Sequence, residues 1–417
     1  MPPQIRSLLI MNAFSFIIFI YIGIFVNLYI WEHAHRIGDV AWFNLVLFLV
    51  WGFTFYIGAK MLRRFSIRVL FACSGLSGGI AFLLLSFLHI DNRMLWIAMI
   101  GVPVGMMWGF FSSAQGLSIS LAGKGKDFAN YFAAQGILTQ ILNVTVPILS
   151  AQVIYWFGYP GSFGLMLLFV IVMLVFSYFL PQISLKGMID RNEKISVRTK
   201  LSWRFYVPTT SLRWLAVSAL VAGVFLQFQG LFALIFTFSV TENKFYIALL
   251  NTCYTLATLL ALYLYRKIRA RERTWLLVCM VTLLVGFLIV LYPTAPLLVI
   301  SNVLTTIGLF YFGTVWNAQH FRVISEFSIA ERARILVWRE GLLTVSRCLV
   351  LVLILPLADF RGLPFYMLLG FTLLTLLVLP FVQSRMVQGN LAPEEAAQED
   401  GLPLQENTSK NAVTTSI

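Results

Sequence analysis

Apolar blocks of about twenty residues or more follow one another along most of the chain, and short polar segments separate them. About 20 apolar residues are enough for a helix to cross the hydrocarbon core of a bilayer. Strands of a membrane barrel alternate polar and apolar positions, so these unbroken blocks favour helices. The pattern predicts an all-α membrane protein with twelve transmembrane helices, at residues 8–31, 39–62, 68–90, 94–121, 128–157, 160–183, 211–238, 244–266, 274–293, 296–324, 334–358 and 362–385.

The composition supports this class and argues against a soluble domain. Hydrophobic residues make up 59% of the 417 residues and charged residues 11%, whereas a soluble domain carries about 25% charged residues. In a soluble protein, the net charge of +13 would indicate a nucleic-acid partner. Here Lys and Arg gather in the loops on one side of the predicted membrane. We therefore expect the lipid bilayer as a partner and no nucleic acid.

The same distribution of Lys and Arg predicts the orientation of the chain. Cytoplasmic loops of membrane proteins carry an excess of these residues. With both termini in the cytoplasm, the inner loops hold most of them, and we predict a multi-pass protein of the plasma membrane in that orientation. The outer loops then hold only Arg36, Arg93, Lys244 and Arg361.

The longest internal polar stretch divides the predicted helices into two sets of six. We expect an N-terminal six-helix bundle at 1–183, a cytoplasmic linker at 184–210 and a C-terminal six-helix bundle at 211–386. Residues 387–417 are acidic, polar and free of aromatic residues, which predicts a disordered cytoplasmic tail.

Short matches between the two halves indicate an internal duplication. They occur in the same order at offsets of 204 to 207 residues, which chance does not readily produce. Parallel six-helix repeats are typical of one large class of transporters. The matched segments are GIF at 23–25 and GLF at 230–232, Asn44 and Asn251, GFFSSAQ at 109–115 and GTVWNAQ at 313–319, and QGILT at 135–139 and EGLLT at 340–344.

In its twelve spans, its 6+6 repeat and its basic central loop, the chain resembles the major facilitator superfamily over nearly its whole length. The resemblance implies two pseudo-symmetric six-helix bundles and transport by alternating access. The family's signature loop between helices 2 and 3 corresponds to AKMLRRFSIR, which keeps Arg64 and Arg68 and has Arg63 in place of an acidic residue. These three arginines are the candidates for a gating role in the cytoplasmic loop. The motifs of the family's drug exporters are absent from helices 4 and 5.

Three charged residues, Arg339, Glu340 and Arg347, lie inside the predicted eleventh helix. An ionised side chain at the bilayer centre costs at least ~2.5–3.5 kcal/mol, so such residues usually face a protein interior or a wet cavity. Glu340 is either a proton or cation site or one member of a buried pair that joins helix 11 to helix 2. Arg347, seven residues further on and on the same face, either binds an anion or has a structural role. Arg339 lies near the inner interface, where we expect it to extend toward water.

Neutral polar residues at similar depth are candidates for the rest of a binding site. With Glu340, the amides Gln115, Gln135 and Gln319 would form a polar layer that the duplication repeats in both halves. Further candidates are the side chains of Gln227, Gln229 and Trp108, which either line a cavity or pack between helices.

The sequence holds no phosphate-binding glycine loop, no HExxH and no CxxC, so we expect no enzyme, no cofactor and no metal site. We predict a monomeric secondary transporter for a small anionic or amphipathic solute, with any proton coupling through Glu340. Two alternatives stay open. One is a flippase for a lipid-linked substrate, and the other is a receptor or enzyme subunit that does not translocate a solute.

Overall fold

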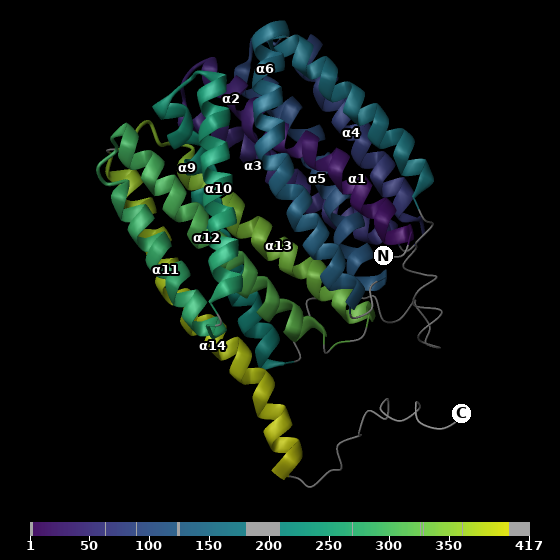
Figure 1. Cartoon of the computed structure of the whole chain (residues 1–417), viewed down its shortest axis with the longest axis vertical. Coiled ribbons are helices and arrows are strands. Elements are labelled where there is room, and N and C mark those ends of the chain that lie inside the picture. The colour runs from purple at the N-terminus through teal and green to yellow at the C-terminus, as the bar shows by residue number, and fades with distance from the viewer. Residues whose placement is uncertain are drawn as a thin grey trace.

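The computed structural model describes residues 3–399, apart from residues 63, 89, 123–125, 181–208, 269, 326, 328 and 361. Its described residues form helices and short connections, without strands (Figure 1). The elements are α1 (Pro3–Tyr21), the π-helical turn η1 (Ile22–Val26), α2 (Asn27–Glu32), α3 (Ile37–Met61), α4 (Ile67–Phe87), α5 (Arg93–Ala122), α6 (Lys126–Phe179), α9 (Thr210–Val240), α10 (Lys244–Lys267), α11 (Glu272–Ile289), α12 (Ala295–Ser325), α13 (Ile329–Ile354) and α14 (Leu363–Glu399).

These helices account for the twelve predicted spans. Among the described residues, ten helical segments are long and apolar enough to cross a membrane. One of them, Ala134–Phe179, has 46 residues and holds two spans, which meet at Gly158. Gly158 has φ 67°, a backbone conformation that glycine adopts without a steric penalty. The remaining predicted span is α13, which is not among the ten segments. Its charged residues make it less apolar than they are. The chain is therefore a multi-pass membrane protein.

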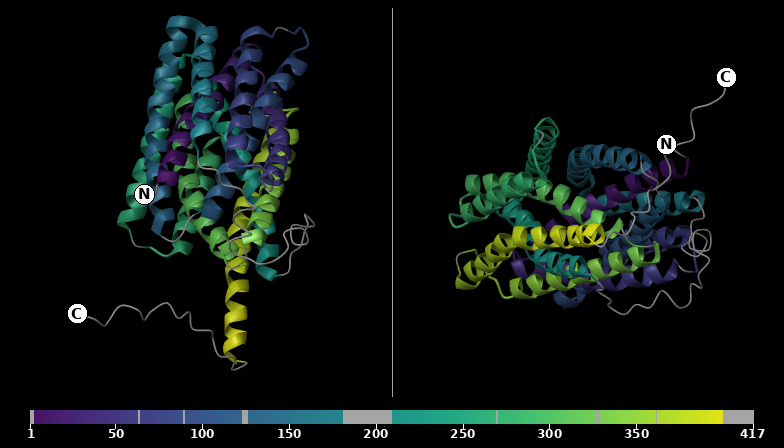
Figure 2. Two further views of the ribbon diagram at one scale, coloured as in Figure 1. Left: turned by 90° about the vertical axis from the view of Figure 1, so that its right-hand side faces the viewer. Right: turned by 90° about the horizontal axis from the view of Figure 1, so that it is seen from below.

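The two halves of the chain pack in matching ways. In the first half α5 packs against α3 and α4, and in the second half α12 packs against α10 and α11. The halves meet where α3 contacts α13 and where α6 contacts α10. Each of these contacts joins the second helix of one half to the fifth helix of the other. The duplication read from short sequence matches is therefore also present in the packing. Figure 2 shows most of the helices side by side along the long axis, with the end of α14 projecting beyond them.

Small residues bring two helices of the first half into close contact. A Cβ atom on Gly105 of α5 would lie 2.5 Å from the Leu47 carbonyl oxygen of α3, and one on Gly109 would lie 2.6 Å from Thr54 Cβ. Without water to drive apolar surfaces together, membrane helices gain stability from such close backbone packing. The four-residue spacing of these glycines thus fixes the distance between α3 and α5.

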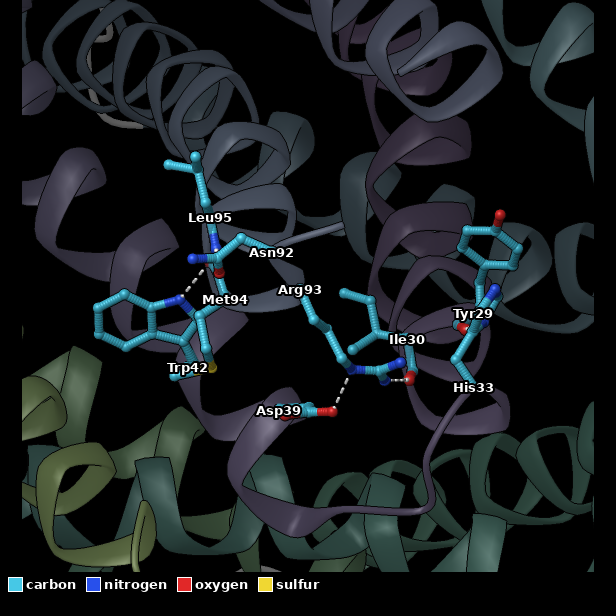
Figure 3. A network of polar contacts seen from close by, with 9 residues as sticks. All are labelled: Tyr29, Ile30, His33, Asp39, Trp42, Asn92, Arg93, Met94 and Leu95. Atoms are coloured by element: carbon cyan, nitrogen blue, oxygen red, sulfur yellow. Dashed lines mark hydrogen bonds and ion pairs between the residues drawn. The ribbon is translucent and has the colours of Figure 1, made fainter. Parts of the chain in front are cut away.

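A partly buried ion pair joins the outer ends of three helices, where "outer" means the side opposite the predicted cytoplasmic loops. Arg93 donates from Nε to Asp39 Oδ2 at 2.6 Å and from Nη2 to the Ile30 carbonyl at 2.9 Å (Figure 3). The indole of Trp42 donates to the Met94 carbonyl at 2.9 Å. These bonds connect α2, α3 and α5, so the outer end of the first half is held as a unit.

The helices depart from the sequence-based expectation at the C-terminus. Helix α14 continues to Glu399, whereas we predicted disorder from residue 387. The segment LAPEEAAQE is rich in Ala and Glu, which are strong helix formers. The backbone helix thus takes in the first part of the predicted tail, and disorder of the remainder stays a prediction. Most of the predicted linker at 184–210 and the tail beyond residue 399 lie outside the described residues.

Candidate functional site

One face of α13 carries charged side chains toward the other half of the molecule. Glu340, Thr344 and Arg347 follow at spacings of four and three, which places them on one face of a helix. Thr344 lies against α3, because a Cβ atom on Gly52 would stand only 2.6 Å from Thr344 Cγ2. The face with Glu340 and Arg347 is thus turned to the boundary between the two halves and away from lipid.

Arg347 lies over aromatic rings of α3. Its Cζ atom is 5.0 Å from the ring centre of Phe48 and 5.4 Å from that of Trp51. Both distances are within the range of cation–π attraction. The residue is partly exposed, and within the described residues its guanidinium makes no hydrogen bond or ion pair. A positive charge from the second half therefore rests on rings of the first half with its N–H donors unused.

The rings beneath Arg347 continue across the first half as a row. We call Phe48, Trp51, Trp108 and Phe19 the aromatic row. Phe48 and Trp51 stack at 5.3 Å, Trp51 and Trp108 lie 5.2 Å apart, and Trp108 and Phe19 lie 4.8 Å apart. The row leads from α3 over α5 to α1. The indole N–H of Trp108, a residue singled out in the sequence, is buried without a hydrogen-bond acceptor among the described residues.

Glu340 is partly exposed and has no direct cationic partner within the described part of the chain. Neither Arg347 nor a described basic residue of α3 forms an ion pair with it. Of the two readings for Glu340, a buried pair that joins helix 11 to helix 2 therefore finds no support in the geometry. Its carboxylate lies on the same helix face as Arg347 and acts electrostatically on that guanidinium.

Arg339 does not extend to water, so this expectation was wrong. Its side chain is only 7% exposed, donates from Nη2 to Asn317 Oδ1 at 2.7 Å, and lies over the Trp316 ring at 4.4 Å. Both partners belong to α12. Because a hydrogen-bond acceptor and a ring are available inside the second half, the guanidinium is buried there.

A buried polar cluster in the second half escaped the sequence analysis. It consists of Ser218 of α9, Trp316 and His320 of α12, and Gln383 of α14. Trp316 Nε1 donates to Ser218 Oγ at 2.9 Å, Gln383 Nε2 donates to the same oxygen at 2.7 Å, and His320 Nε2 lies 3.1 Å from it. Two donors occupy the lone pairs of the hydroxyl, so its own proton must go to His320 Nε2. The spacing of Trp316 and His320 by four residues was the available signal.

The predicted amides fall into different environments. Gln319 donates to Glu272 Oε2 at 3.1 Å inside the second half. Gln229 donates to Thr305 Oγ1 at 3.5 Å, also between helices of that half, and Gln227 is buried. The side chains of Gln319 and Gln229 therefore face helices of their own half, and a four-membered polar layer does not form.

The other two amides are nearer to the predicted arrangement. Gln115 of α5 and Gln135 of α6 are both partly exposed, as is Glu340. The Gln135 Oε1 atom is buried without a hydrogen-bond donor among the described residues. These two amides keep polar atoms that a bound molecule can use.

The arginines of the predicted gating loop are only partly described. Arg63 lies outside the described residues. Arg64 is exposed, and Arg68 donates from Nε to the Leu180 carbonyl and lies over the Tyr178 ring at 5.9 Å. Arg68 therefore joins α4 to the end of α6 within the first half.

At the outer end, one ion pair and one contact between a histidine and a carboxylate join the two halves. Lys244 Nζ lies 2.7 Å from Glu32 Oε1, and His35 Nδ1 lies 3.1 Å from Glu242 Oε1. Each pair has one member shortly before α3 and the other near the start of α10. We call these two pairs the outer latch, because they hold the outer ends of α2 and α10 together.

Open space lies beside the first helix of each half. A Cβ atom on Gly23, in η1, or on Gly230, in α9, would meet no atom within 4 Å. These are positions that the duplication matches. Most residues in the apolar windows of these two spans are buried inside the protein, 56% and 67%. Gly23 is partly exposed and Gly230 is exposed, so neighbouring helices do not fill the space beside either glycine.

Comparison with known proteins identifies the fold. No protein-family model matches the chain. It is 24% identical to an uncharacterized protein of Bacillus subtilis (strain 168), YqgE, over 90% of this chain and 88% of that protein. The structure resembles a mutant of the nucleoside transporter NupG with a TM-score of 0.64 and 14% identity, over 92% of this chain and 99% of the NupG chain.

Two further solved structures show the same likeness. A POT family transporter in complex with 5-aminolevulinic acid has a TM-score of 0.67 and 10% identity, over 92% of this chain and 97% of that one. A bacterial homologue of the iron transporter ferroportin, in an inward-facing state, has a TM-score of 0.64 and 14% identity, over 92% and 98%. The chain thus has the all-helical, two-bundle fold of major facilitator superfamily transporters.

Proposed function

We propose that the protein is a secondary transporter that moves a small anionic solute across the plasma membrane by alternating access, with both termini in the cytoplasm. The observation that carries this proposal is the position of Arg347. It lies at the boundary between the halves, over Phe48 and Trp51, and forms no ion pair with any of the described residues. An anion bound there touches both moving parts, as a transported solute must.

The energetics favour an anionic ligand at this position. Removing a charge from water costs several kcal/mol, and cation–π contacts offset only about 0.5–2 kcal/mol of this. A planar guanidinium binds a carboxylate or phosphate through paired hydrogen bonds, which are among the stronger polar contacts in proteins. The binding of an anion therefore satisfies the unused N–H donors of Arg347.

The two halves, residues 1–183 and 211–386, would rock about the contacts of α3 with α13 and of α6 with α10. The outer latch joins the outer ends of the two halves, while open space lies beside Gly23 and Gly230 on the first helix of each half. This combination fits a state in which the site is closed to the outside. The solved structures with this fold include a nucleoside transporter and a bacterial homologue of the iron transporter ferroportin, which supports transport in general.

The test is flux of labelled anions in proteoliposomes, with acetate, succinate and benzoate as probes. We expect the wild type to move at least one of them. Arg347→Gln should reduce that flux about 10–100-fold, because a hydrogen bond to a charged group contributes about 1.5–3 kcal/mol. Arg213→Gln, at an exposed position of α9, is the matched control and should leave flux unchanged. Equal flux in Arg347→Gln and wild type contradicts the proposal.

Glu340 is the proposed coupling group. A protonated Glu340 leaves Arg347 as the dominant local charge and favours the anion, whereas an ionised Glu340 on the same helix face repels it. Glu340→Gln should therefore keep anion exchange and lose its dependence on a proton gradient, measured in the same vesicles. If Glu340→Gln retains full proton-dependent uptake or efflux, coupling does not run through this residue.

A further inference from the structure

We infer that the anion handled at Arg347 carries a flat aromatic ring next to its charged group. This inference rests on the proposed function and narrows its substrate class. It follows from what surrounds the guanidinium. On one side lie Phe48 and Trp51, and these rings continue into Trp108 and Phe19 without interruption.

The geometry decides where the body of a bound anion lies. Because rings cover one side of the guanidinium, an anion reaches Arg347 from the uncovered side or along its edge. An anion that binds along the edge places the atoms attached to its charged group beside Phe48 and Trp51, which are both partly exposed. Gly23, in the turn η1 that follows α1, has open space beside it four residues after Phe19.

The chemistry of the aromatic row favours a ring over other apolar groups. Aromatic pairs gain attraction beyond the burial of their area, because the edge of one ring meets the face of another. A small, strongly hydrated anion gains nothing from these rings and loses water next to them. The row therefore favours anions with an aromatic ring over small anions, and the charge of Arg347 favours anionic rings over neutral ones.

Four probes separate the contribution of charge from that of the ring. Benzoate has both, cyclohexanecarboxylate has a charge and a saturated ring, acetate has a charge alone, and benzamide has a neutral ring. We expect titration calorimetry on the purified full chain to give the highest affinity for benzoate. Its affinity should exceed that for cyclohexanecarboxylate about three- to tenfold and that for acetate by more than about tenfold. Benzamide should bind weakest.

Variants show which residues cause the differences in affinity among the probes. Trp51→Leu should lower benzoate affinity at least about threefold and leave acetate affinity unchanged, since it removes a ring and keeps the charge. Arg347→Gln should lower the affinity for both anions. Trp156→Leu is the matched control, because Trp156 on α6 is 64% exposed and outside the row, and it should change neither. Thermal melting of each variant checks that it folds.

The outcomes distinguish this inference from the proposed function. If acetate and cyclohexanecarboxylate bind as tightly as benzoate, or if Trp51→Leu has no effect on benzoate, the aromatic preference is wrong while an anion site at Arg347 stands. If Arg347→Gln leaves all affinities unchanged, the anion site and the preference both fail. Absence of binding by all four probes also overturns the inference.

Discussion

At the residue scale, partners from other helices decide what a polar side chain in the membrane does. Arg347 and Glu340 stood out in the sequence because charge in a bilayer is costly, and the structure places both at the boundary between the halves. The same reasoning misjudged Arg339 and overlooked His320. Their partners on α12 and α9 are brought close only by the tertiary fold, so the sequence of one helix did not reveal them.

Ser218 offers a test of the buried cluster. Ser218→Ala leaves the N–H donors of Trp316 and Gln383 and the acceptor of His320 buried without a partner. An unsatisfied buried group costs about 1–3 kcal/mol, so this variant should unfold at clearly lower temperature or denaturant concentration in detergent. Ser384→Ala, at an exposed site of α14, is the control. Equal stability of both variants would show that the cluster contributes nothing.

At the element scale, the lengths of the hydrophobic blocks predicted where the transmembrane helices lie. The contacts between those helices depend on small residues such as glycine. The predicted boundary between the fifth and sixth spans is confirmed, because α6 consists of two helical stretches that meet at Gly158, whose backbone is not helical. The close packing of α5 on α3 depends on glycines of α5. Their spacing can be read from the sequence, but the sequence does not indicate which helix they contact.

Gly105 tests the α3–α5 contact. In Gly105→Leu, the new Cβ atom meets the Leu47 carbonyl oxygen at 2.5 Å, and a backbone atom of a packed helix does not move aside easily. Overpacking of this kind costs about 1–3 kcal/mol or more. Thermal melts in detergent should show a strong loss for this variant and little change for Gly164→Leu, where a Cβ atom meets nothing within 4 Å. A Gly105→Leu protein as stable as Gly164→Leu would be incompatible with the packing described.

The outer latch predicts a shift between states. Glu32→Gln removes the ion pair with Lys244, which is partly exposed and contributes about 0.2–1 kcal/mol. The outward-open population should rise up to about fivefold, seen as faster reaction of a cysteine at Gly230 with a maleimide added outside. Glu272→Gln, which breaks an ion pair within the second half, is the control. Unchanged labelling in Glu32→Gln, or an equal rise in both variants, would show that the outer latch does not stabilise the closed outer side.

At the scale of the whole molecule, the duplication was the most informative feature of the sequence. Short matches predicted two related halves, and the contacts of α3 with α13 and of α6 with α10 repeat one arrangement twice. The site breaks this symmetry, because Glu340 stands where the first half has Gln135. Contacts between the halves, such as that of Arg347 with Trp51, depend on how the two halves pack together. No pattern along the chain specifies this packing.

The most direct test is a cryo-electron microscopy or crystal structure of the protein with 4-iodobenzoate, whose iodine marks the ligand unambiguously. We expect the carboxylate on the Arg347 guanidinium and the ring beside Trp51, between the two halves. Iodine density only at sites away from this boundary, with Arg347 still bare over Phe48 and Trp51, would contradict it.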